Sequence, residues 1–454
     1  MAGEVVLVAE EKKVGGSVEI ISTTNVKPKK SDIGRKECQL VTFDLPYLAF
    51  YYNQKLLIYK GGHENFDEVV EKLKDGLALV LDEFYQLAGK LDKDEDGVFK
   101  VVYDDDMAGV EVAAASAEDV EVAELTAEEG TSKFKELLPY NGVLNLEGMQ
   151  RPLLAVQLTK LKDGLVMGCT FNHAILDGTS TWHFMSSWAD ICKGAHTVAV
   201  PPFLERTKAR STRVKLNLTQ PSDAPEHANS AQTNGGAAKS EPPLREKVFK
   251  FSESAIDRIK AKVNAGNPPK PYSTFQSLSA HVWQAVTRAR DLAPTDYTVF
   301  TVFADCRKRV DPPMPESYFG NLIQAIFTVT GAGLVLGNPV EFGAGLIQTA
   351  IESHNAEAIN KRNDEWESNP IIFQYKDAGV NCVAVGSSPR FKVYEVDFGW
   401  GGPESVRSGL NNRFDGMVYL YPGKSGGRSI DVEISLEGKA MEKLEKDDEF
   451  LMEI

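Results

Sequence analysis

The chain has 454 residues, of which 42% are hydrophobic and 25% charged, and its formal net charge at pH 7 is −15. A chain of this length and composition forms two or three globular domains and is neither fibrous nor wholly disordered. Its negative charge repels phosphate backbones, which excludes nucleic acid as a partner. No apolar run approaches the roughly 20 residues that a membrane-spanning helix needs, so we expect a cytosolic protein with no membrane span.

An amphipathic helix is predicted near the front of the chain, over residues 64–91. Its apolar side chains recur at spacings of three and four, at Val69, Leu73, Leu77, Val80, Phe84 and Leu87. Gly89 stands where a helix C-terminal cap is expected. The runs GVFKVVYDD and RPLLAVQLTKL that follow are typical of strands.

A linker is predicted at residues 221–245, because this stretch is rich in Pro, Ala, Asn, Ser and Gly and has almost no large apolar side chain. It separates two halves of similar size, each of which mixes helices with strands. The predicted fold class is therefore α/β, with two domains whose mostly β cores are flanked by helices. We place the N-terminal domain at 1–205, the crossover linker at 206–245 and the C-terminal domain at 246–454.

The second half contains one strong helix pattern, in STFQSLSAHVWQAVTRARDL, followed by the strand-like runs VFTVFADC and FKVYEV. Near its end, MVYLYPGKSGGRSIDVEISL predicts a hairpin around a Gly-rich turn. GKSGG formally matches the GxSxG nucleophile elbow. That elbow requires a helix after the turn, whereas a second strand is predicted here, so the hairpin is favoured.

His173 is the strongest candidate for a catalytic group. It follows the apolar strand GLVMGCTF and begins HAILDG, which precedes a helix with Thr179 or Ser180 as its predicted N-cap. A polar side chain at a strand end before a tight turn is a usual place for catalysis. Asp177 lies four residues on and either folds back to fix the loop or pairs with an Arg from elsewhere. Capping of the turn alone remains an alternative for both residues.

Other chemistries lack their motifs. The chain has no GxxxxGK[ST], HExxH or GxGxxG pattern, and its five cysteines are scattered with no CxxC pair. This pattern predicts reduced thiols and no metal site. A second unusual segment, Asp397-Phe398-Gly399-Trp400-Gly401, surrounds an aromatic side chain with glycines, which permit close backbone approach. It is interpreted either as part of the active site or as a loop that packs a domain edge.

Together these segments resemble a known family. HAILDG and DFGWG, in this order, are similar to the HxxxD and DFGWG signatures of plant BAHD acyltransferases. YFGN at 318–321 and LAGKL at 87–91 match two further elements of that family, the second with Lys in place of Arg. The longer runs TFDLPYLAFYYNQK and KDAGVNCVAVGSSPRFKVYEVDFG resemble the Defective in Cuticular Ridges branch of the family, which is implicated in building cutin polyester.

The resemblance implies a monomeric CoA-dependent acyltransferase with its active site in a channel between the two domains. His173 would act as general base, with no metal and no tightly bound cofactor, because neutral imidazole can accept the proton of an attacking hydroxyl. In the family, the residue matching Asp177 pairs with an Arg, for which Arg307 is the candidate. Asp397 and Trp400 would keep the channel in shape.

Acyl-CoA would be the donor, and its phosphates need local cations. The expected contacts are Ser273, Thr274, Arg288 and Arg290, with further basic candidates at Lys208, Arg210, Arg213 and Lys215.

Family members that use shikimate-like acceptors carry Thr-Ser-Trp where this chain has Gly386-Ser387-Ser388, which favours a longer or bulkier hydroxylated acceptor such as a hydroxy fatty acid. Two alternatives stay open. One is a hydroxycinnamoyl transferase acting on ω-hydroxy fatty acids or another phenolic acceptor, and the other is a catalytically silent scaffold.

Overall fold

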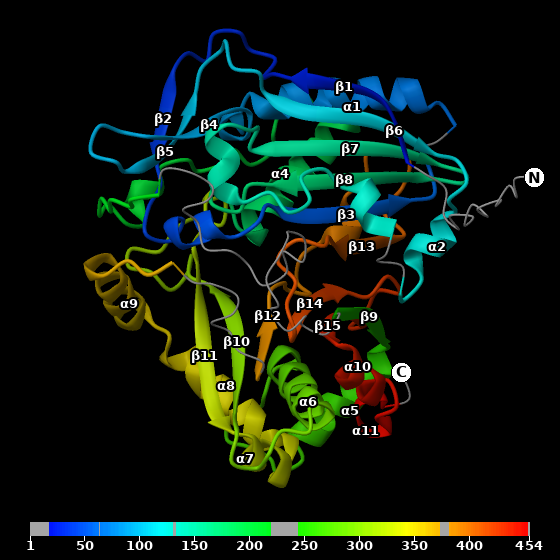
Figure 1. The fold of residues 1–454 in the computed structure, drawn as a ribbon, viewed down its shortest axis with the longest axis vertical. Helices are drawn as coiled ribbons and strands as arrows, with labels where there is room; N and C mark the ends of the chain where they lie inside the picture. The colour runs from blue at the N-terminus through cyan, green and yellow to red at the C-terminus, as the bar shows by residue number, and fades with distance from the viewer. Residues whose placement is uncertain (1–17, 63, 130–132, 219–243, 373–380, 453–454) are drawn as a thin grey trace, which may run out of the picture.

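The computed structural model describes residues 18–62, 64–129, 133–218, 244–372 and 381–452. Residues 219–243, which hold most of the predicted linker, lie outside the described residues. Strands form two six-stranded sheets and one small sheet, and Figure 1 shows the two large sheets one above the other, each with helices on its faces.

The upper sheet contains the strands of the first half. In spatial order its strands are β1 (Glu19–Val26), β6 (Val110–Ala117), β7 (Leu154–Leu161), β8 (Leu165–Phe171), β3 (Asn53–Tyr59) and β13 (Ser405–Ser408). All neighbours are antiparallel except β6 and β7. The last strand, β13, comes from the second half of the chain and pairs with β3, so the upper sheet is completed by a segment that lies far beyond the linker.

The lower sheet is formed by strands from Leu244 onward, so its first strand begins within the last two residues of the predicted linker. Its order is β11 (Ile323–Gly331), β10 (Tyr297–Asp305), β12 (Cys382–Val385), β14 (Met417–Pro422), β15 (Ile430–Glu437) and β9 (Leu244–Phe251). The pairs β10–β12 and β12–β14 are parallel, and the others are antiparallel. The small sheet has the order β2 (Lys36–Gln39), β5 (Phe99–Tyr103) and β4 (Lys90–Lys93).

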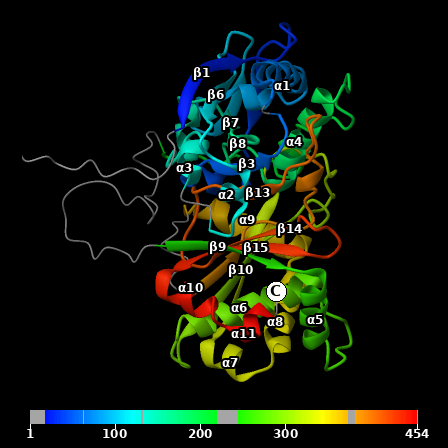
Figure 2. The ribbon, with the colours of Figure 1, turned by 90° about the vertical axis from the view of Figure 1, so that its right-hand side faces the viewer.

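The helices cover both sheets. Those of the first half are α1 (Phe66–Leu81), α2 (Val122–Thr126), α3 (Phe134–Leu137) and α4 (Gly178–Cys192), with short 3-10 turns η1 (Leu45–Ala49), η2 (Tyr85–Ala88), η4 (Asn145–Met149) and η5 (Arg206–Lys208). Those of the second half are α5 (Glu253–Val263), α6 (Thr274–Ala289), α7 (Ala332–Gly337), α8 (Val340–Ser353), α9 (Ala356–Ser368), α10 (Gly438–Leu444) and α11 (Asp448–Leu451), with the 3-10 turn η8 (Val393–Glu395). Figure 2 shows α1 and α4 together at one edge of the upper part.

Alternation along β3 explains how the upper sheet is covered on both faces. Leu57 and Tyr59 belong to the large core that also contains the apolar side of α1 and α4. Leu56 and Ile58 point the other way, into a smaller core with α2 and α3. The larger core also includes Val396 and Phe398 of the second half, so apolar packing continues from one half into the other.

Most predicted elements are confirmed. The runs GVFKVVYDD and RPLLAVQLTKL contain β5 and β7, the strong helix pattern of the second half is α6, and VFTVFADC lies in β10. The hairpin is also confirmed, because β14 pairs antiparallel with β15 around the Gly-rich turn. GKSGG is therefore a hairpin turn rather than a nucleophile elbow.

Three local predictions are wrong. The front helix α1 ends at Leu81, and Phe84 and Leu87 reach the core through a turn and η2. Gly89 does not cap that helix, since its backbone is extended and a Cβ there would collide with the carbonyl of Val102 in β5. The run FKVYEV forms η8 rather than a strand.

Candidate active site

His173 stands two residues beyond the end of β8. That strand is wholly buried because it lies between β7 and β3, and its apolar residues therefore face covered surfaces on both sides. The His173 ring stacks on Tyr47 of η1 with a centroid distance of 4.5 Å and an interplanar angle of 12°. A catalytic imidazole needs one fixed orientation, and the stacking supplies part of it.

Two buried asparagines, one from each half of the chain, hold the backbone of His173. Its N–H donates to Oδ1 of Asn145 at 2.8 Å, and its carbonyl accepts from Nδ2 of Asn321 at 2.8 Å. Asn172 adds a third bond, from its Nδ2 to the carbonyl of Asn145 at 2.7 Å. Asn145 and Asn321 are fully buried, so these bonds are shielded from competing water.

The surroundings of His173 favour its neutral form. Burial lowers the pKa of the imidazole below its usual value, and the ammonium of Lys55 acts in the same direction, while Asp177 opposes both. A neutral imidazole can accept a proton, so the local electrostatics suit a general base.

Asp177 forms a bidentate ion pair with Arg307, as predicted. Oδ2 accepts from Nη1 at 2.9 Å and Oδ1 accepts from Nη2 at 3.0 Å. The carboxylate also accepts from the N–H of Ser180 at 3.0 Å and of Leu322 at 3.0 Å. Burial by itself raises the pKa of Asp177, but the Arg307 charge and these hydrogen bonds outweigh it and hold the pKa below its usual value.

The bond from Ser180 makes Asp177 the N-cap of α4. The expectation that Thr179 or Ser180 caps this helix is therefore wrong. The physical reason is that a carboxylate at this position both accepts an unpaired N–H of the first turn and meets the positive end of the helix dipole.

One buried residue beneath this loop, Arg206, could not be singled out from the sequence. Its guanidinium donates to Asp44 at 3.0 Å, to Gln86 at 2.8 Å and to the carbonyl of Ile175 in the His173 loop at 2.6 Å. It lies in FLERTKAR, whose alternating charges are typical of a solvated surface. Only the fold brings Asp44 and Ile175 to it.

Asp397 lies away from this loop. Its Oδ1 accepts from the N–H groups of Gly399 and Gly401, both at 2.8 Å, and its Oδ2 lies 3.5 Å from Nζ of Lys193, just beyond the end of α4. Asp177 and Lys193 stand at opposite ends of α4, about 24 Å apart at 1.5 Å per residue. The geometry therefore favours a positioning role for Asp397 over contact with reacting atoms.

The rest of the Asp397 loop docks on the first half of the chain. Phe398 is buried edge-on against Trp188 of α4, with centroids 5.1 Å apart. Trp400 packs against the ring of Tyr59 and against Gly61, where a Cβ would lie 2.9 Å from the Trp400 Cβ. This loop is thus a docking element that joins the second half to β3 and α4.

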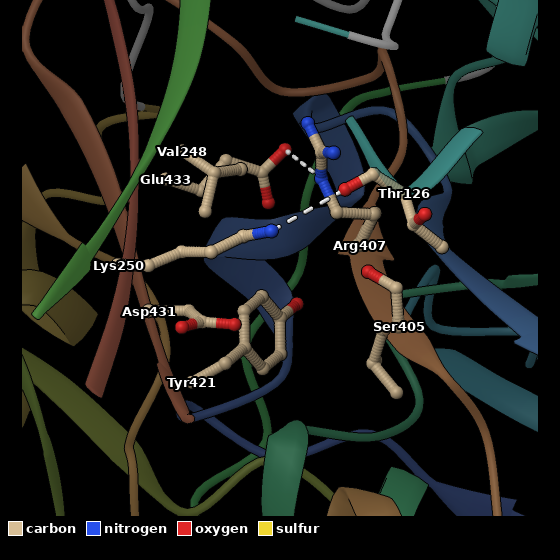
Figure 3. A pocket seen from close by; sticks show the side chains of 9 residues that line it. Thr126, Val248, Lys250, Ser405, Arg407, Tyr421, Asp431 and Glu433 are labelled. Atoms are coloured by element: carbon tan, nitrogen blue, oxygen red, sulfur yellow. Dashed lines mark hydrogen bonds and ion pairs between the residues drawn. The ribbon is translucent and has the colours of Figure 1, made fainter. Parts of the chain in front are cut away.

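A cleft of about 490 Å³ opens between the two large sheets. Its lining includes three lysines, four serines and three acidic residues: Lys60, Lys250, Lys424, Ser252, Ser405, Ser425, Ser429, Asp163, Glu404 and Asp431. Figure 3 shows a neighbouring pocket that shares Thr126, Lys250, Ser405 and Asp431 with the cleft and that Tyr421 also lines. Burial raises the pKa of Asp431 to about 6, which weakens its negative charge near neutral pH.

The residues predicted to hold CoA are not among those that line the cleft. The Oγ of Ser273 caps α6 by accepting from the N–H of Gln276, and the half-buried Thr274 begins that helix. Arg288 pairs with Asp447 at 2.7 Å, and Arg290 pairs with Asp415 at 2.9 Å.

The further basic candidates before the linker also have carboxylate partners nearby where the structure records their ion pairs. Lys208 lies 3.8 Å from Glu205, Arg210 contacts Glu367 at 2.6 Å, and Arg213 contacts Asp94 at 2.5 Å. Lys215 forms an isolated β-bridge with Val98.

Comparison with known proteins agrees with these features. Residues 16–451 match the model of the Transferase family. The chain is 62% identical to BAHD acyltransferase DCR of Arabidopsis thaliana, over 96% of this chain and 92% of that protein. This chain belongs to the BAHD acyltransferase family.

Two further matches place this BAHD acyltransferase more broadly. It is 32% identical to hydroxycinnamoyl-CoA:5-hydroxyanthranilate N-hydroxycinnamoyltransferase HHT1 of Avena sativa, over 89% of this chain and 91% of that protein. It shares its fold, with a TM-score of 0.72 and 20% identity, with TRI101 of F. sporotrichioides in complex with coenzyme A and T-2, over 92% of this chain and 98% of that chain. In the described part of this BAHD acyltransferase, no helix has the length and apolar character needed to cross a membrane.

The segment 386–391 of this BAHD acyltransferase lies close to the His173 loop. Phe391 packs near Trp182 of α4, and a Cβ at Gly178, next to Asp177, would lie 2.9 Å from the Phe391 ring. Gly386 is crowded by side chains, because a Cβ there would meet the terminal methyl group of Met417 and the ring of Tyr419. The predicted acceptor segment is thus brought to the N-terminus of α4.

Proposed function

We propose that this BAHD acyltransferase moves an acyl group from CoA to a hydroxyl, with His173 as general base. The observation that carries the proposal is the half-buried imidazole of His173 at a strand end, stacked on Tyr47 and held through its backbone by Asn145 and Asn321, in surroundings that lower its pKa. A silent scaffold would not need such an arrangement, since Nδ1 of His173 is a buried atom without a hydrogen-bond partner among the described residues, and such an atom is costly unless a function uses it.

The chemistry follows from these groups. His173 takes the proton of the acceptor hydroxyl while its oxygen forms a bond to the thioester carbon. The C–S bond then breaks, and the thiolate takes the proton back from the imidazolium. Asp177 does not exchange a proton in this scheme, because its carboxylate is committed to Arg307, Ser180 and Leu322. It fixes the loop that carries His173.

For the donor, we propose that CoA occupies the cleft between the sheets. Lys60, Lys250 and Lys424 provide cations for its phosphates in a protein that is acidic as a whole. The volume of about 490 Å³ lies within the range of ligand sites. Tyr421 lines the pocket that adjoins this cleft. An acyl group that extends from the cleft toward the upper sheet would contact the Tyr421 side chain.

For the acceptor, we propose a hydroxylated fatty-acid-type lipid of the kind used in cutin. Gly386, Ser387 and Ser388 have smaller side chains than the Thr and Trp of the shikimate-type relatives, and Phe391 of the same segment packs on Gly178 and Trp182 at the N-terminus of α4. A long aliphatic chain can use such space, whereas a small polyol acid gains nothing from it. A second candidate donor is a hydroxycinnamoyl-CoA, because the Avena sativa relative transfers that group according to its name.

We also propose that the enzyme is a cytosolic monomer. All five cysteines are free thiols, and Cys169, Cys192, Cys306 and Cys382 are buried, which suits a reducing compartment. Light scattering after size exclusion checks the monomer, and a fluorescent fusion in plant cells checks the compartment.

The base is tested by His173→Ala. Its turnover should fall by about 100-fold or more with an unchanged melting curve, since general-base contributions have that size. His183→Gln is the matched control, because His183 lies on α4 and bonds the carbonyl of Val200 rather than the His173 loop, and it should retain turnover. Near wild-type turnover of His173→Ala would refute the proposal.

Incubation with a panel of acyl-CoAs and hydroxylated lipids, with products read by mass spectrometry, identifies the substrates.

The donor site is tested by Lys250→Glu, which should weaken binding of CoA about ten-fold in calorimetry. Lys361→Glu, an exposed lysine on α9, is the control for a change of net charge. Arg288→Ala tests the alternative site at the end of α6. If Arg288→Ala weakens CoA binding and Lys250→Glu does not, the donor lies at α6 and not in the cleft.

A further inference from the structure

Lys55 is a buried lysine on β3, in register with Cys169 of β8 on one side and Ser408 of β13 on the other. Its exposure is 4%. Cys169 lies four residues before His173 on the strand that leads into the catalytic loop. A cation in the middle of the upper sheet is therefore placed one strand away from the proposed base.

The ammonium of Lys55 meets hydroxyl and aromatic groups. Nζ donates to Oη of Tyr421 at 3.2 Å and lies 5.6 Å and 5.8 Å from the ring centroids of Tyr419 and Tyr421. Oη of Tyr421 in turn lies 2.7 Å from Oγ of Ser408. Within the part of the chain that the structure describes, the ion pairs recorded within 4.0 Å include none of Lys55.

The nearest buried acid is already engaged. Glu433 contacts Arg413 at 2.5 Å and Arg407 at 3.6 Å, and Figure 3 shows its carboxylate directed toward Arg407. Burial lowers the pKa of Lys55 to about 8, with Arg413 acting in the same direction and Glu433 opposing. An ammonium has three N–H donors, and the described contacts of Lys55 use one of them. The side chain thus retains hydrogen-bonding capacity toward an incoming anionic oxygen.

Lys55 also interacts with a residue on each side of the proposed reaction. Tyr421, its hydrogen-bond partner, lines the pocket that adjoins the proposed CoA cleft (Figure 3). The positive charge of Lys55 also lowers the pKa of His173. Lys55 is thus linked to the donor side through Tyr421 and to the base through its charge.

We propose that Lys55 is a catalytic residue that stabilises the oxyanion formed on the thioester carbonyl during acyl transfer. This proposal rests on the proposed function. As the acceptor oxygen bonds to the carbonyl carbon and its proton goes to His173, the π electrons of the carbonyl move onto its oxygen. Lys55 donates to that oxygen. When the electrons return, the C–S bond breaks and the thiolate takes the proton from His173.

This role gives a chemical reason for a buried lysine that has no carboxylate partner among the residues that the structure describes. A fixed positive charge at a site shielded from water interacts strongly with charge that develops only in the transition state. A partner carboxylate would cancel that effect. Tyr421 and Tyr419 hold the ammonium in place without neutralising it, because their hydroxyl and ring faces carry no net charge.

The test uses the full-length enzyme with Lys55→Met and Lys55→Arg. Lys55→Met should lower kcat by about 100-fold, the usual size for loss of one oxyanion donor, while the KM for acyl-CoA changes by less than about three-fold. Lys55→Arg, which keeps the charge, should recover at least ten-fold of that loss. Lys74→Met, a half-buried lysine of α1 paired with Glu71, is the matched control and should keep wild-type kcat.

A second measurement needs no substrate. The pKa of His173, followed by NMR of its ring protons, should rise in Lys55→Met and stay low in Lys55→Arg. The other groups that act on His173 are Asp177 of its own loop and the stacked Tyr47 of η1, and both remain in these variants. This shift reports that the charge of Lys55 reaches His173, and the kcat of the same variants reports its action on the carbonyl oxygen.

The two proposals fail separately. Wild-type kcat in a folded Lys55→Met variant, with His173→Ala still inactive, overturns the role of Lys55 and leaves the proposed function standing. Full activity of His173→Ala overturns the proposed function. If Lys55→Met does not fold, a Lys55→Arg variant with unaltered fold but no activity and a raised His173 pKa also overturns the proposal, because the retained charge should preserve both.

Discussion

An aspartate lies next to a cation at each end of α4, but the two ion pairs differ in burial and in the distance between their charges. At the N-terminus, Asp177 and Arg307 are fully buried and joined by two short bonds of 2.9 Å and 3.0 Å. At the C-terminus, Lys193 and Asp397 have side-chain exposures of 44% and 29% and are 3.5 Å apart. Both pairs link the two halves of the chain, since each takes one member from either side of the linker.

The difference shows which motif is held rigidly. Every oxygen of Asp177 is committed, so the loop that carries His173 has one conformation. Asp397 uses one oxygen to fold its own Gly-rich loop, and the packing of Phe398 and Trp400 holds that loop against β3 and α4. The Asp177 carboxylate therefore acts through its ion pair with Arg307. The Asp397 carboxylate acts through hydrogen bonds to the backbone of its own loop.

Breaking the buried pair should have the largest effect. Arg307→Met leaves the Asp177 charge uncompensated, and removal of one partner of a buried pair costs about 3–5 kcal/mol of the free energy of unfolding. Turnover should fall as well, because the His173 loop loses its anchor. Chemical denaturation of both proteins measures the loss. A loss below 1 kcal/mol would mean that the pair does not restrain the loop.

The pH dependence of this loss sharpens the comparison. In the native protein the pKa of Asp177 is held below its usual value, so the pair contributes stability above the unfolded-state pKa of about 4 and loses it as the pH falls through the lower folded value. In Arg307→Met, burial without a partner raises the folded pKa, and the variant is destabilised as the pH rises from about 4. Denaturation curves should therefore show a larger difference at pH 7 than at pH 4.

Asp397→Ala should cost less, about 1 kcal/mol, because it removes two hydrogen bonds to N–H groups in a partly exposed turn. The melting temperature should fall by only a few degrees, and kcat should fall less than in Arg307→Met. Asp397→Asn is the matched variant, since its amide oxygen can still accept from Gly399 and Gly401, and it should lie close to wild type. A complete loss of turnover with a native fold in Asp397→Asn would instead indicate a catalytic carboxylate.

Lys193→Ala should have the smallest effect, between about 0 and 1 kcal/mol, because exposed ion pairs contribute little. Its effect should also disappear at high salt, which screens exposed charges. A larger loss, insensitive to salt, would show that Lys193 supports the Asp397 loop by packing rather than by charge.

The sequence by itself determined the elements whose residues form local patterns. Apolar runs and spacings predicted β8, α6 and the β14–β15 hairpin, because burial of one face depends on neighbours along the chain. His173 could be singled out for the same reason, as a polar side chain that ends a buried strand. The resemblance of short motifs to a family added the Asp177–Arg307 pair, which no local pattern could show.

The tertiary structure alone decided which charges meet. Arg206 lies in a charged stretch typical of a solvated surface, but it is buried beneath the His173 loop. Arg288 and Arg290 were expected to bind CoA, but they pair with acidic residues of the second half. Asp397 could be placed near the base or at a domain edge, and it contacts Lys193 at the end of α4, about 24 Å along the helix from Asp177. In the sequence, Lys55 is an ordinary polar residue of a strand. It is buried because β13 pairs with β3 and Tyr421 of β14 contacts its ammonium group. The energy of a charge depends on its distance to other charges and to water, and residues hundreds of positions apart set both.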